Sequence, residues 1–259
     1  MSLSGKVAVV TGASRGIGRG IAVRLARDGA DVVVNATSEA GLRPVVAEVA
    51  ALGRRCVPVA GDVSRRDDCY RLVQQAVEHC GRLDIMVNNA GVTHICSISE
   101  TREEDWDRVM AINAKGVFLC CQAAAQHMIA QGAGKIINLG SSASLEGFKY
   151  IGAYSASKFA VVALTQTLAK ELGEHGITVN CVCPGIVDTD MWQVTDEGLA
   201  RYLHTERGGA FRQYCAGILL KQRPGTPEDI AGTVAFLASP DGDYLTGCTI
   251  SVSGGLTLH

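Results

Sequence analysis

The chain has 259 residues, of which 47% are hydrophobic and 19% are charged, and its 24 basic and 26 acidic side chains leave a formal net charge of -2. This balance is typical of a globular protein with a large core, and it excludes a disordered or fibrous chain. Because the charge is near zero and no long lysine or arginine block occurs, the sequence gives no electrostatic reason to expect nucleic acid as a partner.

Short runs rich in β-branched residues alternate with longer stretches of helical period along the whole chain. The runs predict strands at 6–10, 31–35, 56–60, 84–88, 135–139, 177–182 and 248–252. The intervening stretches predict helices near 16–28, 39–52, 65–80, 103–131, 153–173 and 227–238. Apolar strands joined by helical crossovers indicate a parallel sheet with helices on both faces. The expected fold is therefore α/β: a single doubly wound Rossmann domain over 1–259, with a seven-stranded parallel sheet.

The first predicted strand runs directly into a glycine-rich turn, Thr11-Gly12-Ala13-Ser14-Arg15-Gly16-Ile17-Gly18. Glycines let the backbone turn tightly and approach a pyrophosphate, and the following helix offers free N–H groups and the positive end of its dipole. A position after the first strand of a βαβ unit indicates a dinucleotide-binding loop rather than an ordinary tight turn.

The end of the second predicted strand bears on the choice between NAD and NADP. An acid about 20 residues past the glycines binds the ribose hydroxyls and repels a 2′-phosphate. Here that place reads Asn35, Ala36, Thr37 and Ser38, with no carboxylate until Glu39. The cation of Arg15 and the hydroxyls of Thr37 and Ser38 suit a 2′-phosphate. The sequence favours NADP(H) over NAD(H); the alternative is that Asn35 serves an NAD ribose and Arg15 is a solvated loop residue.

A third group of residues has the composition of an acid–base site. Tyr154 and Lys158 lie one turn apart at the start of a predicted helix, and Ser141 stands thirteen residues earlier, after the fifth strand. A tyrosine alone is a poor acid–base group near neutral pH, but a neighbouring ammonium favours its phenolate. Taken singly, these residues are better explained as a helix-start aromatic, a surface cation and a cap.

Together with the glycine-rich turn, these residues resemble the short-chain dehydrogenase/reductase family over essentially the full chain. Further family positions follow in order: Asp62-Val63, Asn88-Asn89-Ala90-Gly91, Asn113, Pro184-Gly185 and Thr189. The resemblance implies a nicotinamide cofactor. Its expected contacts are Gly12, Ser14, Arg15, Gly16, Ile17, Gly18, Asn35, Thr37, Ser38, Asp62, Val63, Asn89, Ala90, Gly91, Tyr154, Lys158, Pro184, Gly185, Ile186, Val187 and Thr189.

The resemblance also implies a hydride exchanged between the nicotinamide and a carbonyl or secondary alcohol. Tyr154 would exchange the hydroxyl proton, while Lys158 would hold the nicotinamide ribose and favour the phenolate. Ser141 would position the substrate oxygen, and Asn113 would support a water that relays protons. Substrate contacts are expected from Ser141, Ala143, Tyr154 and Trp192. The family further implies a homotetramer built through its long helices.

Two subgroups of the family resemble different parts of the chain. KYIGAYSASKFAVVALTQTLAKEL and PGIVDTDMW resemble acetoin (diacetyl) reductases, butanediol dehydrogenases and polyol dehydrogenases. TGASRGIGRGIA and NATSEAG resemble 3-oxoacyl-acyl-carrier-protein reductases, which use NADPH. We expect a small ketone, secondary alcohol or sugar alcohol as substrate, with the acyl-carrier ketone as the alternative. A non-catalytic dinucleotide sensor is a further alternative, against which the intact Ser141, Tyr154 and Lys158 argue.

The stretch 186–226 interrupts the alternation of strands and helices. It is too long for a simple connection, and it follows the sixth strand at the end where doubly wound sheets bind ligands. Its large side chains are Met191, Trp192, Tyr202, Phe211 and Tyr214. We expect 186–226 to be a substrate-loop insertion, with 186–220 moving as a lid and Trp192 closing the pocket. The alternative is permanent packing against the core or a neighbouring subunit.

The remaining features of the sequence are negative. The ten cysteines include the pairs Cys120-Cys121 and Cys181-Cys183 but no CxxC, and both pairs lie in apolar stretches, so we expect buried reduced thiols and no metal site. No apolar run is long enough to span a bilayer, and the start MSLSGKVAVV is unlike a signal peptide. We therefore expect a cytoplasmic protein with no membrane partner.

Overall fold

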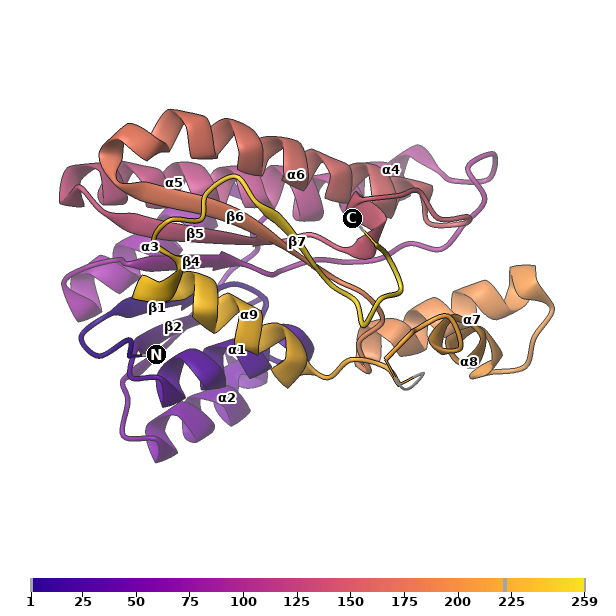
Figure 1. The fold of residues 1–259 in the computed structure, drawn as a ribbon, viewed down its shortest axis with the longest axis horizontal. Coiled ribbons are helices and arrows are strands. Elements are labelled where there is room, and N and C mark those ends of the chain that lie inside the picture. The colour runs from indigo at the N-terminus through magenta and orange to yellow at the C-terminus, as the bar shows by residue number, and fades with distance from the viewer. Residues whose placement is uncertain (1, 221–222, 259) are drawn as a thin grey trace.

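A computed structural model describes residues 2–220 and 223–258 of the chain. Seven strands form one parallel sheet in the order β3-β2-β1-β4-β5-β6-β7 (Figure 1). The strands are β1 (Val7–Val10), β2 (Asp31–Ala36), β3 (Cys56–Ala60), β4 (Ile85–Asn88), β5 (Gly134–Leu139), β6 (Ile177–Pro184) and β7 (Thr249–Val252). The expected doubly wound parallel sheet is confirmed, and each predicted strand begins and ends within two residues of the observed one.

Helices cover both faces of the sheet (Figure 1). One face carries α1 (Gly16–Arg27), α2 (Glu39–Ala51) and α9 (Pro227–Ala238), and the other carries α3 (Arg66–Cys80), α5 (Gly116–Gln131) and α6 (Gly152–Leu172). Residues of β1 and β4 are buried at every position because helices pack on both sides of them. This explains why their sequences are continuous apolar runs rather than alternating ones.

The helix expected over 103–131 is a continuous run of three pieces. α4 (Glu103–Met110) passes into a π-helical turn over Ala111–Lys115, and α5 follows without a break. A π-helical turn inserts one extra residue into the helix and often occurs at functional sites. The π-helical turn contains Asn113, which the family resemblance predicts to support a proton-relaying water.

The order of strands reverses between β1 and β4. β1 pairs with β2 on one side and with β4 on the other, so the crossovers from these two strands leave in opposite directions. In doubly wound sheets such a reversal opens a crevice at the carboxyl ends of the strands, where ligands bind. The glycine-rich turn after β1 and residues 89–92 after β4 both lie there.

The described part of the expected substrate-loop insertion contains two helices. α7 (Asp190–Leu203) and α8 (Gly209–Cys215) make a lobe to one side of the sheet (Figure 1). Its own small core consists of Ile186, Cys215 and Ile218, with Trp192, Phe211, Tyr214 and Leu256 packed against it. Periodicity alone missed these helices because much of their apolar surface faces the lobe and the cavity described below, not the main core.

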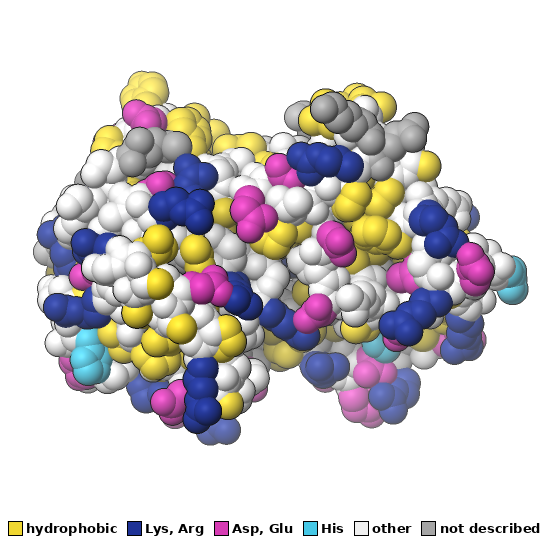
Figure 2. Space-filling model, turned by 90° about the horizontal axis from the view of Figure 1, so that it is seen from below, with side chains coloured by type: hydrophobic (Ala, Val, Ile, Leu, Met, Phe, Trp, Pro, Cys, Tyr) yellow, Lys and Arg dark blue, Asp and Glu magenta, His cyan; other side chains and the backbone are white. Residues whose placement is uncertain are grey.

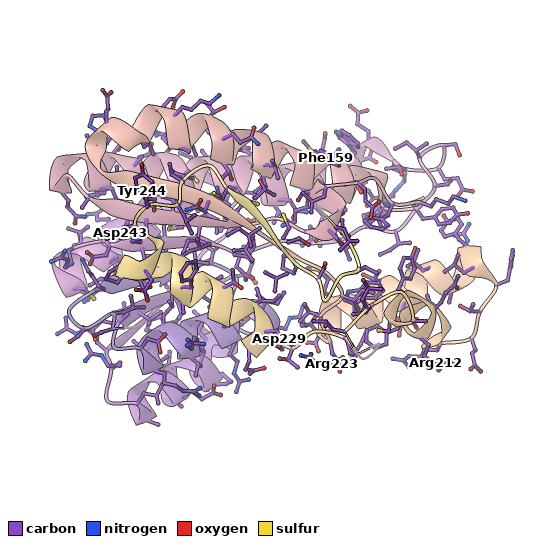
Figure 3. The ribbon with its side chains drawn as sticks, in the orientation of Figure 1. Phe159, Arg212, Arg223, Asp229, Asp243 and Tyr244 are labelled. Atoms are coloured by element: carbon purple, nitrogen blue, oxygen red, sulfur yellow. The ribbon has the colours of Figure 1, made fainter. Side chains whose placement is uncertain are left out.

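The two segments that join the lobe to the sheet domain pair with each other through backbone hydrogen bonds. The N–H of Gly225 donates to the carbonyl of Ile186 at 2.8 Å, and the N–H of Asp188 donates to that of Gly225 at 3.0 Å. Arg223 then pairs with Asp229 at 2.7 Å, at the start of α9 (Figure 3). The Arg223 hydrogen bond lowers the pKa of Asp229 to about 2. The chain therefore leaves and re-enters the sheet domain at one fixed place.

All ten cysteines are free thiols; Cys69, Cys120, Cys121, Cys181, Cys183 and Cys215 are buried, and the other four are half-buried. Among the described residues, no group of three or more His, Cys, Asp or Glu is arranged to hold a metal ion. No helix within 2–220 or 223–258 combines the length and apolarity needed to cross a membrane. Figure 2 shows basic and acidic side chains intermixed over one face of the molecule, and a hollow between the sheet domain and the α7–α8 lobe.

Candidate active site

The turn after β1 requires glycine at three positions. Gly12 and Gly16 have φ of +63° and +55°, in the left-handed region that favours glycine. A Cβ on Gly12 would lie 2.8 Å from Cα of Ala90, and one on Gly18 would lie 2.3 Å from the Gly12 carbonyl oxygen. Nδ2 of Asn89 donates to the carbonyls of Thr11 and Gly12, at 2.9 and 3.1 Å. The turn is therefore tightly packed against the segment that follows β4.

A groove runs from this turn across the carboxyl ends of the strands. Most of the expected cofactor contacts line it: Gly12, Ser14, Arg15, Gly16, Ile17, Gly18, Asn35, Thr37, Asp62, Val63, Asn89, Ala90, Gly91 and Thr189. Among the described residues no side chain caps the N-terminus of α1, whose free N–H groups and dipole suit an anion. The close backbone approach and the uncapped helix fit the pyrophosphate of a dinucleotide.

Three of the expected cofactor residues have structural partners; Asn35 and Arg15 line the groove, whereas Ser38 does not. Ser38 caps α2, where its Oγ accepts from the N–H of Gly41 at 3.4 Å. Nδ2 of the buried Asn35 donates to the carbonyls of Val59 and Gly61, at 3.1 Å each. Arg15 pairs with Asp190 of α7 at 2.8 Å, and both side chains are exposed. The sequence offers no signal for the partners of Asn35 and Arg15, because these contacts join distant parts of the chain. Only the Ser38 cap is local.

Tyr154 and Lys158 lie on one face of α6, as predicted. Nζ of Lys158 is 5.7 Å from the centroid of the Tyr154 ring, and it donates to the carbonyl of Leu139 at 2.7 Å. Lys158 is 5% exposed, which places its ammonium inside the molecule at the end of β5 and excludes the surface-cation interpretation. The charge is thus held beside the tyrosine.

Ser141 begins a short turn directly after β5. Its Oγ accepts from the N–H of Ala143 at 3.1 Å, while the N–H of Ser141 donates to Oγ of Ser144 at 3.0 Å. This reciprocal cap holds the serine in place and leaves its hydroxyl proton free to donate. Ser141 therefore caps the turn, as the structural alternative predicts, and it also lies at the edge of a cavity.

That cavity adjoins the cofactor groove and has a volume of about 150 Å³. The expected catalytic and substrate residues Ser141, Ala143, Tyr154, Lys158 and Trp192 line it, as do Pro184, Gly185, Ile186 and Val187. Sequence reasoning missed further lining residues, which include Phe148, Ile151, Thr195, Leu199 and Leu256. Leu256 comes from the C-terminal segment, and only the folded chain brings it to this place.

The site thus combines a glycine-rich turn, a serine after β5 and a tyrosine–lysine pair. A comparison of the sequence with known protein families agrees with this arrangement. The model of the short chain dehydrogenases matches residues 6–200. The chain belongs to the short-chain dehydrogenase/reductase family. It is accordingly an oxidoreductase that acts on CH–OH groups with a nicotinamide dinucleotide cofactor.

Curated members of the family align with nearly the whole chain. A diacetyl reductase, (S)-acetoin forming, from Staphylococcus epidermidis is 44% identical, covering 98% of this chain and 99% of the relative. An L-2,3-butanediol dehydrogenase from Corynebacterium glutamicum is 41% identical, with 98% and 99% covered. A 3-oxoacyl-[acyl-carrier-protein] reductase from Synechocystis is 38% identical, with 99% of each covered.

The fold also matches solved structures of the family. The crystal structure of a short-chain type dehydrogenase/reductase from Mycobacterium marinum superposes with a TM-score of 0.90 at 36% identity, covering 100% of this chain and 98% of that one. This likeness extends beyond the sheet to the α7–α8 lobe, because the coverage leaves no part of the chain out.

Asn113 of this short-chain dehydrogenase/reductase is fully buried in the π-helical turn. Its Nδ2 donates to the carbonyl of Val92 and to Oγ of Ser157, at 2.9 and 3.1 Å, and its Oδ1 accepts from the N–H of Val92 at 2.8 Å. The side chain thus ties the segment after β4 to α6. Its role toward a relayed proton stays a prediction.

Two buried thiols lie next to the turn that contains Ser141. The Sγ atoms of Cys181 and Cys183 are 3.8 Å apart on β6, and a Cβ on Gly140 would lie 2.7 Å from Sγ of Cys183. The hydrogen bond from Cys181, with smaller contributions from Ser141, Ser144 and Lys158, lowers the pKa of Cys183 to about 7. Gly140 is therefore needed to let the Ser141 turn pass over these sulfurs.

Proposed function

We propose that this enzyme interconverts a small ketone and a secondary alcohol of the acetoin, diol, polyol or sugar-alcohol type. The observation that carries the proposal is the cavity beside the cofactor groove, which combines Ser141 and Tyr154 with a mostly apolar lining. Small concave sites of this kind enclose a compact substrate and orient it through a few polar groups. The diacetyl and butanediol activities named for the relatives support the same class.

Tyr154, Ser141 and Lys158 have different roles in the proposed reaction. The nicotinamide, when bound, supplies or accepts the hydride. The hydroxyl of Tyr154 gives its proton to the carbonyl oxygen in reduction and takes it back in oxidation. The Ser141 hydroxyl donates to the same oxygen and fixes its position, and the buried Lys158 ammonium stabilises negative charge on the tyrosine oxygen.

A substrate panel tests the proposal. The enzyme is assayed with NADPH and with NADH against diacetyl, acetoin, sugar ketones and an acetoacetyl thioester, by the absorbance of the reduced nicotinamide. We expect turnover of the small ketones with a higher kcat/KM than of the thioester. Turnover of the thioester alone would assign the enzyme to the acyl-carrier reductases, and no turnover of any substrate would leave the sensor hypothesis.

The cofactor preference is the first prediction. We propose that NADP(H) is preferred, since Ala36 and Thr37 line the groove where an acid would repel a 2′-phosphate. A charge-assisted phosphate contact contributes about 1.5–3 kcal/mol, or about ten- to a hundredfold in specificity. Ala36→Asp should shift the ratio of kcat/KM values toward NADH by this factor. Ala51→Asp, at the far end of α2, is the control for added charge. A wild-type preference for NADH would show that Arg15, paired with Asp190, does not serve a phosphate.

The lid is the second prediction. We propose that 186–220 closes over the substrate, with Trp192 covering the cavity it lines. Trp192→Ala should raise KM for a small ketone about tenfold with little change in cofactor affinity. Hydrogen exchange across 186–220 should slow when cofactor and a substrate analogue bind together. Equal exchange with and without ligands would mean that the lobe is a fixed element.

We also propose a homotetramer, as the family resemblance implies. α5 and α6 lie next to each other on one face of the sheet (Figure 1) and carry the exposed side chains Phe118, Ile129 and Phe159. Exposed large apolar side chains on adjoining helices are typical of subunit contacts. Light scattering of the purified protein measures the assembly directly.

A further inference from the structure

Helix α7 forms part of the wall of the cavity and contacts the sheet domain at both ends. Its 14 residues extend over about 21 Å. At its first residue, Asp190 pairs with Arg15 of the glycine-rich turn at 2.8 Å. At its other end, Tyr202 contacts the sheet domain. Between these ends Met191, Trp192, Thr195 and Leu199 line the cavity. The position of these side chains is therefore set by where the two ends of α7 are attached.

The attachment at the Tyr202 end is an aromatic stack. The rings of Tyr150 and Tyr202 are 4.2 Å apart between centroids and tilted by 11°. The hydroxyl of Tyr202 accepts from the N–H of Ser97 at 3.1 Å and donates to Oε2 of Glu100 at 3.0 Å. Close by, Cβ of Ile95 would lie 2.7 Å from a Cβ on Gly198. α7 thus packs against two segments of the sheet domain, 95–100 and 148–151, when the stack is formed.

Tyr150 adopts a backbone conformation that a tyrosine rarely takes. Its φ is +67°, in the left-handed region, and its carbonyl accepts from the N–H of Cys96 at 2.8 Å. A bulky residue persists in this region only where its surroundings hold it there, and such strain occurs mainly at functional sites. α6 begins two residues later, and Tyr154 is four residues beyond Tyr150. The stacked ring and the catalytic tyrosine thus belong to one short, constrained segment.

We propose that Tyr150 and Tyr202 are positioning residues that set the distance between the α7 side chains in the cavity and the hydroxyl of Tyr154. They touch neither substrate nor cofactor; the stack connects the helix that covers the substrate to the segment that carries the proton donor. The inference rests on the proposed function for its kinetic consequence, because KM for the ketone reports that distance. Its structural consequence is independent of which substrate is turned over.

Tyr202→Ala removes the stack and all contacts of the hydroxyl, with Ser97, Glu100 and Cys96. We expect KM for the ketone to rise about three- to tenfold, with the KM of the nicotinamide and the melting temperature near their wild-type values. Tyr202→Phe keeps the ring and should restore most of the wild-type KM. Tyr244→Ala is the matched control, because Tyr244 is fully exposed and lies at the end of the molecule opposite the lobe (Figure 3). An unchanged ketone KM in Tyr202→Ala would overturn the proposal.

A fluorescence measurement without substrate separates this inference from the proposed function. In a Trp106→Phe background Trp192 is the remaining indole, and it is half-buried on α7 against Phe211 and Tyr214. We expect Tyr202→Ala to shift its emission to the red, while Tyr202→Phe and Tyr244→Ala leave it unchanged. An unshifted emission would overturn the positioning role even if the wild type turns over no ketone of the panel.

The same contact can be removed from the other side. Tyr150→Ala deletes the stack but keeps every hydrogen bond of Tyr202, so it stands in if Tyr202→Ala does not fold. In a double-mutant cycle the two alanine substitutions should raise the ketone KM together by no more than the larger single effect. Effects that simply multiply would mean that the two tyrosines act independently, and the coupling would be wrong.

Discussion

Tyr154→Phe is expected to lower kcat by about 10²–10⁴-fold, the usual contribution of a positioned acid–base group. The ring remains in the wall of the cavity beside Lys158, so packing and cofactor affinity should stay close to those of the wild type. Only the exchangeable proton is lost. Steady-state rates at the nicotinamide absorbance measure kcat, and titration of the nicotinamide fluorescence measures cofactor binding.

Tyr244→Phe provides the control, since it deletes the same atom from a fully exposed side chain. In the wild type, the rate of alcohol oxidation should rise with pH, because oxidation needs the tyrosine oxygen as a base; Tyr154→Phe should lose this rise. A Tyr154→Phe enzyme with a near-normal rate would mean that another group moves the proton. Turnover that the substitution removes also excludes the non-catalytic sensor.

The sheet was predictable from the sequence because its signal is local. The runs at β1 and β4 are buried on both sides, so each strand is a short apolar stretch that stands out from the helical segments around it. The doubly wound parallel arrangement followed from the crossover rules and from the glycine-rich turn after β1, which marks the first βαβ unit. β7 was predicted from its β-branched residues alone, since its four positions are only half-buried.

The proximity of Tyr154 and Lys158 was also predictable, whereas the hydrogen-bond partners of the candidate site residues were not. Tyr154 and Lys158 share a helix, so their spacing alone predicts that they adjoin. By contrast, Asn113 lies in a π-helical turn that no periodicity reveals, and Arg15 meets Asp190 across 175 positions of the chain. The α7–α8 segment was expected only as a substrate-loop insertion, and its helices were missed because their apolar residues form a small separate core. Such contacts depend on the tertiary fold, which sequence patterns do not record.

Lys158→Met is expected to separate the stability of the fold from the activity of the site. The ammonium is buried and donates to the Leu139 carbonyl at 2.7 Å. Methionine has a similar length and no charge, so the cost of burying an ion disappears while the space stays filled. The melting temperature should therefore equal or exceed that of the wild type. We expect kcat/KM to fall by about 10²–10³-fold, as when one positioned donor is removed from a developing charge.

Nζ of Lys158 lies next to the wall of the cofactor groove, since a Cβ on the groove residue Gly91 would be only 3.7 Å from it. Lys158→Met should therefore weaken cofactor binding, which Tyr154→Phe leaves intact. Lys170→Met, at an exposed position of α6, controls for the loss of a lysine from that helix. If Lys158→Met lowered kcat but bound the dinucleotide as tightly as the wild type, the ammonium would act on Tyr154 alone. If instead it lowered the melting temperature by many degrees, the buried ammonium would hold β5 to α6, and the loss of activity would be a consequence of a damaged fold.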